Sequence, residues 1–401
     1  MRRAGSGQRL RLGVIGLGRA FMLMMPALKG DPRVELAGAA DPRALARDQF
    51  ERDFHAPAFE DPLEMCARND LDAIYVASPH PHHEEHVLMA AAQGKHVMVE
   101  KPMGISVASC TRMIEACERA AVLLMVGHSH SFDQPILRCL QWIRSGRYGA
   151  VRLLSGWNYT DFMFRPRRAD EFDVQAGGGV VFNQAAHHVD VARLLCGGKV
   201  DRVDAFVGNW HPSRVSHGAY SALLRFEGGA CANLTYSGYA HFNSDTWMDG
   251  IGELGRRVNP GKHHQTIEQL KSGLQQTQEE QLKQQRSYGA TPRFGTEQSP
   301  VAGHQHFGPL IVSCDKADLR PTALGIHVDS DEGYHFEPLA LSTLERQEVL
   351  DEFLAALWGG RPLLHSGHWG RATLAVCEAI AGSAQTQQGV RPEHQMAVPT
   401  A

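Results

Sequence analysis

The sequence lacks a long apolar run and any strong excess of charge. No run of about 18 apolar residues occurs, so we expect no membrane span. The formal net charge of −4 gives no electrostatic reason to expect nucleic acid or an anionic membrane as a partner. The basic start, with Arg2, Arg3, Arg9 and Arg11, is not followed by the apolar segment of a signal peptide. We therefore expect a cytoplasmic protein.

Paired cysteines and recognisable metal motifs are missing as well. The 8 cysteines include no C-x-x-C pair and are typical of small buried residues in a reducing compartment. Among the 22 histidines, H-x-H pairs occur at His128/His130 and His304/His306. Neither pair has a carboxylate or cysteine at a recognisable offset, so we expect no metal site.

The 401 residues are enough for two domains with separate cores. Over residues 1–128, apolar strand-like runs alternate with helical segments, which predicts an α/β domain with a doubly wound parallel sheet of the Rossmann type. From about residue 149, strands follow one another with polar alternation. They predict an α+β domain over residues 129–401, with a mostly antiparallel open sheet and helices on one face.

One segment, residues 255–308, differs in composition from its surroundings. Residues 265–285 are rich in Gln, Glu and Lys, and residues 288–308 are rich in Gly, Pro and Thr. We interpret the segment as an insertion that forms an interface element, a lid or a mobile excursion, and we assign it no chemistry.

A glycine turn follows the first expected strand, residues 10–15. It reads Gly16-Leu17-Gly18-Arg19-Ala20-Phe21, or G-x-G-x-x-F. Gly16 permits the tight turn, and Gly18 lets backbone N–H groups approach a pyrophosphate at a helix N-terminus. Phe21 replaces the small third residue of the dinucleotide fingerprint and is expected to loosen the helix–strand contact.

Asp41 ends the second expected strand, 20 residues after Phe21. An acid there can bind the adenine ribose hydroxyls, although Asp41 could also cap a helix that begins at Pro42. Arg43 could instead accept a 2′-phosphate. NAD is favoured over NADP.

The expected strand at residues 96–99 ends on Glu100-Lys101-Pro102. Ligands of open α/β sheets bind at the carboxyl ends of strands, which is where Lys101 lies. Pro102 restricts the backbone of Lys101 to extended geometry. Taken alone, a solvated surface lysine remains the alternative.

A second glycine turn, residues 177–179, is expected to open one helix through residue 191. On that helix Asn183, His187 and Asp190 stand at i, i+4 and i+7, on one face. The stripe indicates either a ligand site or a buried polar network that only holds the helix in place.

Together these motifs resemble the glucose–fructose oxidoreductase/inositol dehydrogenase (Gfo/Idh/MocA) family, over nearly the whole chain except residues 255–308 and the last dozen. The resemblance implies a homodimer or homotetramer formed through the C-terminal sheet. Ser78-Pro79-His80 with His83 is similar to the family's S/T-P-N-x-x-H loop near the nicotinamide, with His80 in place of Asn. Glu100-Lys101-Pro102 is similar to its E-K-P motif, whose lysine serves catalysis and the nicotinamide site. The cofactor residues implied are Gly16, Gly18, Arg19, Ala20, Phe21, Asp41, Arg43, Ser78, Pro79, His80, His83, Glu100 and Lys101.

The second glycine motif departs from the family pattern in two places. Asn183 replaces an aspartate and Ala185 replaces a glycine. An asparagine cannot accept a proton at neutral pH, so Lys101 and His187 must carry proton transfer, with the identity of the base open. Lys101, His187 and Asn183 are the catalytic candidates.

Within the family, residues 16–21, 126–133 and 158–168 are most similar to dehydrogenases that act on phthalate 4,5-cis-dihydrodiol. The resemblance implies NAD-dependent oxidation of a cyclic cis-diol dicarboxylate, with arginines suited to its carboxylates. The alternatives are a sugar or polyol dehydrogenase of the same architecture and a non-catalytic dinucleotide-binding regulator. The candidate substrate residues are Lys101, His128, Tyr159, Arg165, Arg167, Asn183 and His187.

Overall fold

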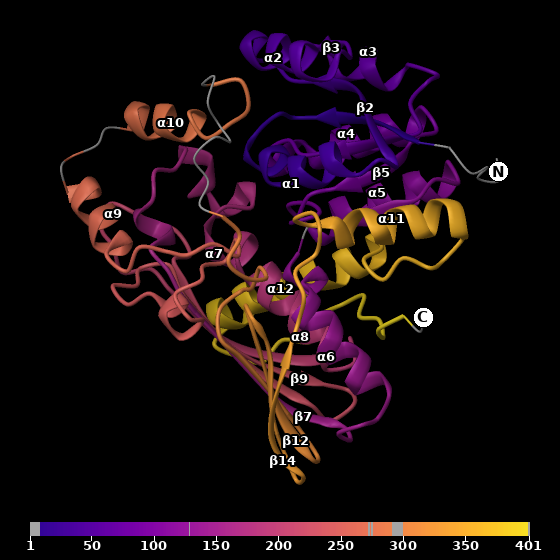
Figure 1. Cartoon of the computed structure of the whole chain (residues 1–401). Coiled ribbons are helices and arrows are strands. Elements are labelled where there is room, and N and C mark those ends of the chain that lie inside the picture. Colours follow the sequence, from indigo (N-terminus) through magenta and orange to yellow (C-terminus); the bar gives the residue numbers. More distant parts are fainter. Residues whose placement is uncertain (1–8, 128, 272, 274–275, 291–299, 400–401) are drawn as a thin grey trace.

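The computed structural model describes residues 9–127, 129–271, 273, 276–290 and 300–399, and contains two sheets (Figure 1). The first is six-stranded and parallel, in the order β3-β2-β1-β4-β5-β6. Its strands are β1 (Leu10–Ile15), β2 (Val34–Ala40), β3 (Ala58–Phe59), β4 (Ala73–Val76), β5 (His96–Val99) and β6 (Leu124–Val126). The predicted Rossmann-type parallel sheet is confirmed.

Helices cover both faces of this sheet because its strands are apolar on both sides. One face packs on α3 (Pro62–Cys66), α4 (His83–Ala92) and α5 (Val107–Arg119). The other face packs on α1 (Arg19–Gly30) and α2 (Ala44–Phe54), and α11 (Gln347–Gly359) from the far end of the chain joins them. The division into domains at residue 128 stays a prediction.

The second sheet has eight strands in the order β14-β13-β12-β11-β7-β10-β9-β8, and among these described strands only the β7–β10 pair is parallel. The predicted mostly antiparallel sheet is therefore confirmed. Sequence reasoning did not identify β12 or β14. The strands are β7 (Val151–Tyr159), β8 (Val200–Gly208), β9 (Ala219–Phe226), β10 (Cys231–Ser237), β11 (Leu310–Cys314), β12 (Ala317–Thr322), β13 (Gly325–Ser330) and β14 (Gly333–Pro338).

One face of the second sheet is covered by helices, as predicted. These are α6 (Gln134–Arg144), α8 (Ala185–Leu195) and α12 (Gly367–Thr386), of which α12 lies along β8. The other face carries exposed apolar side chains such as Leu153 and Phe206. None of the helices in the described part of the chain is long and apolar enough to cross a membrane.

The insertion forms two polar helices, α9 (Lys262–Lys271) and α10 (Gln276–Gln284), drawn in orange in Figure 1. Glu279 of α10 makes a buried ion pair with Arg214 beside the second sheet. Tyr288, which follows α10, donates from its hydroxyl to Asp53 of α2 and packs edge-on against Phe21 at 5.3 Å. The segment is thus fastened to both halves of the molecule.

Candidate active site

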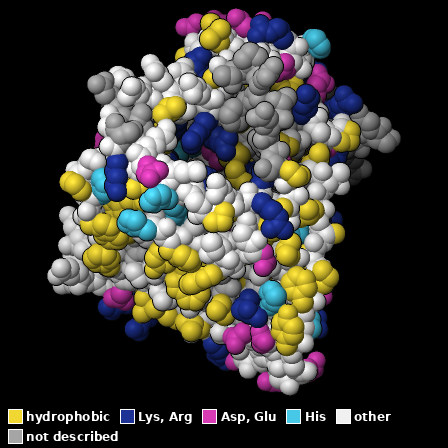
Figure 2. Space-filling view, turned by 60° about the vertical axis from the view of Figure 1, so that its left-hand side comes forward, with side chains coloured by type: hydrophobic (Ala, Val, Ile, Leu, Met, Phe, Trp, Pro, Cys, Tyr) yellow, Lys and Arg dark blue, Asp and Glu magenta, His cyan; other side chains and the backbone are white. Residues whose placement is uncertain are grey.

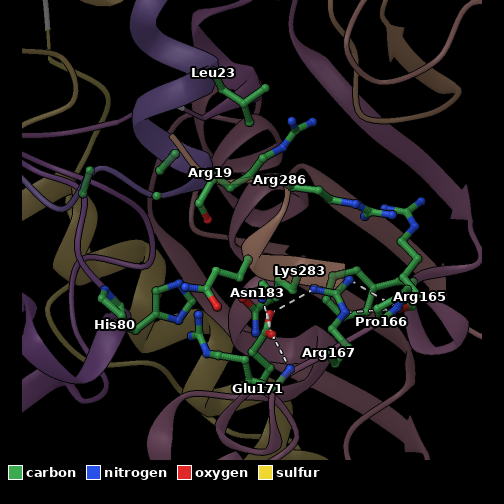
Figure 3. A pocket seen from close by; sticks show the side chains of 18 of the residues that line it. Arg19, Leu23, His80, Arg165, Pro166, Arg167, Glu171, Asn183, Lys283 and Arg286 are labelled. Carbon is green, nitrogen blue, oxygen red and sulfur yellow. Dashed lines mark hydrogen bonds and ion pairs between the residues drawn. The ribbon is translucent and has the colours of Figure 1, made fainter. Parts of the chain in front are cut away.

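A cavity of about 1390 Å³ lies where three parts of the chain meet. The first part is the carboxyl edge of the Rossmann sheet, and the second is the loop that follows β7. The third part is the insertion, which closes the side with α9, α10 and the residues after them. Figure 3 shows side chains from all three parts around this space.

The first glycine turn forms one end of the cavity. Gly16 has φ 92°, and a Cβ there would lie 2.8 Å from the carbonyl oxygen of Ala77, so only glycine fits. A Cβ on Gly18 would meet no atom within 4 Å, and Gly18 is the N-cap of α1. The helix therefore presents backbone N–H groups to open space, as a pyrophosphate site requires. Gly16, Gly18, Arg19 and Ala20 line the cavity.

Phe21 does not line the cavity. Its ring is fully buried and contacts Phe50, Phe54 and Tyr288, with centroids 5.3 to 6.5 Å apart. Phe21 was expected to loosen the contact between α1 and the strand before it, but its ring is packed within this aromatic cluster. We therefore assign Phe21 to packing and to docking of the insertion rather than to direct cofactor contact.

Asp41 and Arg43 lie at the ribose end of the cavity and form an ion pair of 2.9 Å. The Asp41 carboxylate also accepts from the backbone N–H of Leu17 at 2.8 Å, which ties it to the glycine turn. Asp41 is not the N-cap of α2, because Arg43 occupies that position. A 2′-phosphate would meet the Asp41 carboxylate, whereas ribose hydroxyls can donate to it, so the geometry favours NAD.

The loops after β4 and β5 form the nicotinamide end predicted from sequence. Ser78, Pro79 and His80 line the cavity, and burial lowers the pKa of His80 well below its usual range. His83 is fully buried, and its two ring nitrogens contact the carbonyl oxygens of Pro102 at 3.0 Å and Ser78 at 2.9 Å. His83 therefore joins the two loops instead of facing the cofactor.

Glu100 also lies outside the cavity lining. Its carboxylate is buried and accepts from the hydroxyl of Tyr75 at 2.6 Å. This contact fixes the end of β5, so Glu100 positions Lys101.

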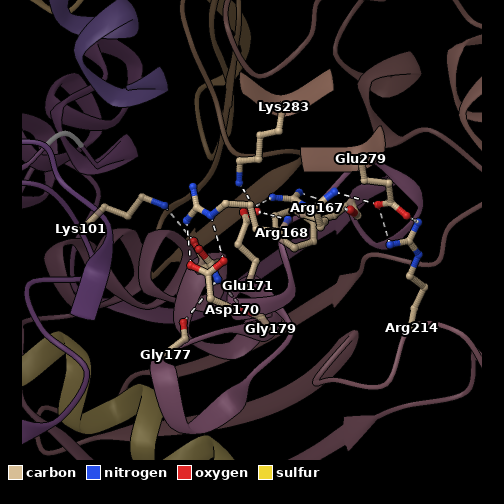
Figure 4. Close-up of polar contacts among 12 residues, drawn as sticks. Lys101, Arg167, Arg168, Asp170, Glu171, Gly177, Gly179, Arg214, Glu279 and Lys283 are labelled. Carbon is tan, nitrogen blue, oxygen red and sulfur yellow. Dashed lines mark hydrogen bonds and ion pairs between the residues drawn. The ribbon is translucent and has the colours of Figure 1, made fainter. Parts of the chain in front are cut away.

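Lys101 is half-buried and donates from Nζ to the backbone oxygen of Asn183 at 2.9 Å (Figure 4). Burial lowers the pKa of its amine. Asn183 lines the cavity, so this contact places Lys101 next to a residue of the cavity wall. The contact links the end of β5 to the second glycine motif.

The predicted single helix through residue 191 is wrong, and the break explains this contact. Two helices, α7 (Gly179–Asn183) and α8, meet at Gln184. In a continuous helix the N–H of His187 would bond to the oxygen of Asn183. It bonds instead to the oxygen of Gln184 at 3.1 Å, which leaves the Asn183 oxygen to accept from Lys101.

The predicted polar stripe does not act as a unit. The amide of Asn183 donates to the oxygen of Gly179 at 3.0 Å and stabilises the glycine turn. Asp190 is buried and accepts from Ser131, from Trp369 Nε1 at 2.5 Å and from Thr373 at 3.2 Å. Asp190 therefore belongs to a buried polar network that ties α8 to α12, which was the alternative to a ligand site.

His187 belongs to a different cluster. His130, His187 and Glu253 each place a potential ligand atom within 4.8 Å of the others. His130 Nδ1 lies 2.7 Å from a carboxylate oxygen of Asp133, and its Nε2 lies 3.4 Å from Glu253. Sequence reasoning missed Glu253 because it looked for a partner at a short offset, and Glu253 is 123 residues from His130.

The loop after β7 places two predicted arginines at the cavity. Arg165 pairs with the fully buried Asp161 at 2.6 Å. Arg167 pairs with Glu171 at 3.1 Å, and its guanidinium stacks 3.5 Å above the ring of Phe162. Both cations line the cavity with part of their charge already balanced.

The insertion adds cations that sequence reasoning did not assign. Lys262, Lys283 and Arg286 line the cavity. Lys283 pairs with Glu171, whereas in the described part of the chain Arg286 makes no ion pair. Burial lowers the pKa of Arg286, and the positive charge of Arg165 lowers it further. In the sequence, the one signal that could have pointed to these cations was the presence of basic residues in a Gln-rich segment.

One predicted substrate residue, Tyr159, is not brought to the cavity. Tyr159 lies on the opposite face of the second sheet, because side chains alternate along β7 and the flanking Asn158 and Thr160 point into the cavity. The ring of Tyr159 packs against Phe242 instead, so a substrate role is not supported. His128 lies outside the described residues.

A parallel dinucleotide-binding sheet with a glycine turn, an acid at the ribose end and a lysine at the nicotinamide end defines an NAD-binding oxidoreductase. Residues 10–128 match "Oxidoreductase family, NAD-binding Rossmann fold", and residues 136–257 match "GFO/IDH/MocA C-terminal domain". The chain belongs to the Gfo/Idh/MocA family.

Known relatives extend over nearly the whole chain. A 1-carboxy-3-chloro-3,4-dihydroxycyclohexa-1,5-diene dehydrogenase of Comamonas testosteroni is 45% identical over 372 residues, covering 92% of this chain and 94% of that protein. A crystal structure from Bordetella bronchiseptica RB50, provisionally called a dehydrogenase, has a TM-score of 0.87 at 36% identity and covers 96% of this chain and 100% of that chain. An Agrobacterium radiobacter oxidoreductase solved with NAD+, L-tartaric acid and magnesium shares the fold, with a TM-score of 0.70 at 18% identity over 96% of this chain and 98% of that chain.

Proposed function

We propose that this enzyme oxidises a ring-carboxylated cyclic cis-dihydrodiol with NAD, and that phthalate 4,5-cis-dihydrodiol, which yields 4,5-dihydroxyphthalate, is its substrate in aromatic degradation. The 45% identical relative is named for a substrate with one ring carboxyl and a vicinal diol, which supports the class of compound. The inference that the substrate carries a second carboxylate is based on the cations that line the cavity.

The observation that carries the proposal is a wall of cations that lines the cavity. Arg165, Arg167 and Arg286 approach from two separate segments, and Figure 2 shows Lys and Arg side chains gathered within a hollow on this face. The charge is dense enough that burial and the neighbouring Arg286 lower the pKa of Arg19 to about 10. Planar guanidinium groups bind carboxylates in bidentate fashion, so a dicarboxylate suits this wall better than a neutral sugar does.

The chain's own groups account for proton transfer. Bound NAD supplies the hydride acceptor. Lys101 lies at the cavity edge with a lowered pKa and is the candidate that takes the hydroxyl proton. His187 is only 5% exposed, whereas Lys101 is half-buried, so we assign the base to Lys101. The ketone formed from a dihydrodiol tautomerises to an aromatic catechol, which favours the oxidative direction.

The testing experiment compares substrates by NADH absorbance. The panel contains phthalate 4,5-cis-dihydrodiol, a monocarboxylated cis-dihydrodiol, neutral benzene cis-dihydrodiol and myo-inositol. We expect kcat/KM to fall in that order. The highest kcat/KM on inositol would favour the polyol alternative and contradict the proposal.

A matched pair of variants tests the wall itself. Arg286→Met should raise KM for the dicarboxylate more than for the neutral diol, because it removes a cation from the cavity. Arg152→Met is the control, since Arg152 pairs with Asp315 beside β7, away from the cavity lining. Equal effects of Arg286→Met on charged and neutral diols would contradict carboxylate binding there.

We also propose that the open face of the second sheet joins copies of this chain into a homodimer or homotetramer. Leu153 is 44% exposed and Phe206 is 61% exposed on that face. Apolar side chains in a sheet face that no helix covers are typical of a subunit interface.

A further inference from the structure

The carboxylate of Glu253 faces the cavity from a tight turn that precedes α9. In this turn the N–H of Gly255 donates to the oxygen of Gly252 at 2.8 Å. The backbone oxygen of Glu253 itself accepts from the N–H of His306 at 3.3 Å. The side chain is 34% exposed and lines the cavity. Because hydrogen bonds fix the backbone around it, the turn presents the carboxylate at one place in the cavity wall.

His130 lies between Glu253 and a second carboxylate, that of Asp133. Its Nδ1 is 2.7 Å from Asp133 and its Nε2 is 3.4 Å from Glu253. A ring with an acceptor at each nitrogen is satisfied when both nitrogens carry a proton. Burial alone would lower the pKa of His130, but the two carboxylates raise it. His130 is therefore an imidazolium that donates to both.

The imidazolium keeps Glu253 ionised. Burial alone would raise the pKa of Glu253, but the hydrogen bond and charge of His130 lower it below its ordinary value, and the charge of Arg165 adds to this effect. An ionised carboxylate can only accept hydrogen bonds. Among the described residues, His130 is the one ion-pair partner of Glu253, and it contacts a single oxygen. The other oxygen is left to accept from a ligand.

Other carboxylates of the cavity serve a different purpose. Asp161 pairs with Arg165, and Glu171 pairs with Arg167, so both balance cations that also line the cavity. Glu253 instead pairs with a histidine that lies behind the cavity lining. A negative charge supported from behind repels a substrate carboxylate and attracts a hydroxyl donor. The arginines and Glu253 therefore suit opposite ends of one substrate.

Glu253 also lies close to Lys101, the group assigned above as the base. Burial lowers the pKa of Lys101 more than the charges of Glu100 and Glu253 raise it, and the charge of Lys101 in turn lowers the pKa of Glu253. The two side chains therefore act on the same part of the site. A vicinal cis-diol carries hydroxyls on adjacent carbons, so it can donate one to Lys101 and the other to Glu253.

We propose that Glu253 binds the hydroxyl of the diol that is not oxidised, as a hydrogen-bond acceptor that His130 and Asp133 hold in place. The assignment rests on the proposed function, in which Lys101 takes the proton of the other hydroxyl. The O–H bond at Glu253 stays intact, because an ionised carboxylate held by an imidazolium is a weak base. Two fixed hydroxyls orient the reacting carbon, whereas a substrate with a single hydroxyl loses one of the two contacts. Glu253 therefore selects for vicinal diols.

Calorimetry with two ligands tests the assignment without turnover. 4,5-Dihydroxyphthalate carries two hydroxyls and two carboxylates, and phthalate carries the carboxylates alone. With NADH bound, Glu253→Gln should weaken binding of 4,5-dihydroxyphthalate roughly 10-fold, because a hydrogen bond to a neutral amide is about half as strong as one to a carboxylate. Phthalate should bind as tightly as before or more tightly, because the variant removes an anion from the cavity. Damage to the site would weaken both ligands.

Glu60→Gln is the matched control. Glu60 follows β3, lines the same cavity and pairs with Arg47 at 3.0 Å. Its substitution removes the same charge at a distance from Lys101 and should leave both affinities unchanged. Wild-type protein gives an independent reading: 4,5-dihydroxyphthalate should bind roughly 10-fold more tightly than 4-hydroxyphthalate, which lacks the second hydroxyl.

Three outcomes overturn the role of Glu253. They are equal weakening of both ligands by Glu253→Gln, no change in either, and equal affinity of the wild type for the dihydroxy and monohydroxy ligands. If the wild type still oxidises the dihydrodiol, the proposed function stands in all three cases. Wild-type protein that binds NAD but binds none of these ligands and oxidises no diol overturns the proposed function instead.

Discussion

Glu279 fastens α10 over the cavity, and Glu279→Gln tests that role. Its carboxylate accepts from both terminal nitrogens of Arg214 at 2.9 Å and from the backbone N–H of Arg167 at 2.9 Å. The two charged side chains are 3% and 5% exposed, so water and salt screen the pair little. The substitution removes the charge and keeps the size of the side chain.

The expected magnitude follows from burial. Removing one partner of a buried ion pair costs about 3–5 kcal/mol, because the other charge stays buried and unpaired. Glutamine retains one acceptor, so we expect the lower end, ~3 kcal/mol, which is roughly a 100-fold change in an equilibrium constant. The helix α10 is short and polar, so we expect it to undock locally while both sheets stay folded.

Hydrogen exchange followed by mass spectrometry measures this undocking. Amides of residues 276–284 should exchange roughly 100-fold faster in Glu279→Gln, while those of residues 185–195 should not change. The double variant Arg214→Met with Glu279→Met should recover most of the protection, because apolar residues of similar volume can replace a buried ion pair. Unchanged exchange in residues 276–284, or equal acceleration everywhere, would refute the reasoning.

Three further predictions concern stability, cofactor binding and assembly. Burial alone would raise the pKa of Glu171, but its cationic neighbours lower that pKa from 4.5 to about 2. The carboxylate should therefore contribute ~3 kcal/mol to the free energy of unfolding above pH 4.5, and this contribution should be lost toward pH 2. Thermal melts of wild type and Glu171→Gln should therefore converge as the pH falls, and a constant gap would contradict this. Gly16→Ala should weaken NAD binding in calorimetry because its Cβ has no room, whereas Gly94→Ala, which also has a positive φ but faces open space, should not. Phe206→Glu should shift light-scattering mass toward the monomer, and an unchanged oligomer would argue against the open sheet face as the interface.

The cofactor-binding part of the site could be predicted because its residues belong to short sequence motifs. The glycine turn, Asp41 and Glu100-Lys101-Pro102 are short motifs, each placed by a strand whose apolar run marks its end. The ends of parallel strands meet at one edge of a sheet, so these motifs had to come together. The same reasoning could not show that Phe21 and Glu100 face inward, since packing decides that.

The substrate-binding part of the site was less predictable because its residues make contacts across long separations in the sequence. Glu253 meets His130 across 123 residues, and no local pattern marks that pair. The helix break at Gln184 accompanies a hydrogen bond that Lys101 Nζ donates to the Asn183 oxygen from 82 residues away, so helical periodicity alone missed it. Tyr159 was predicted as a substrate residue without a prediction of which face of the strand it occupies, and the side chains of neighbouring strand residues point to opposite faces.

Deuterium transfer is the most direct test of hydride transfer from the diol carbon to NAD. Phthalate 4,5-cis-dihydrodiol deuterated at both carbinol carbons is incubated with NAD and the enzyme, and the reduced cofactor is analysed by mass spectrometry. We expect NADH that carries one deuterium, and Lys101→Met should slow its formation strongly while NAD still binds. Absence of deuterated NADH from wild-type enzyme that binds NAD would contradict this expectation.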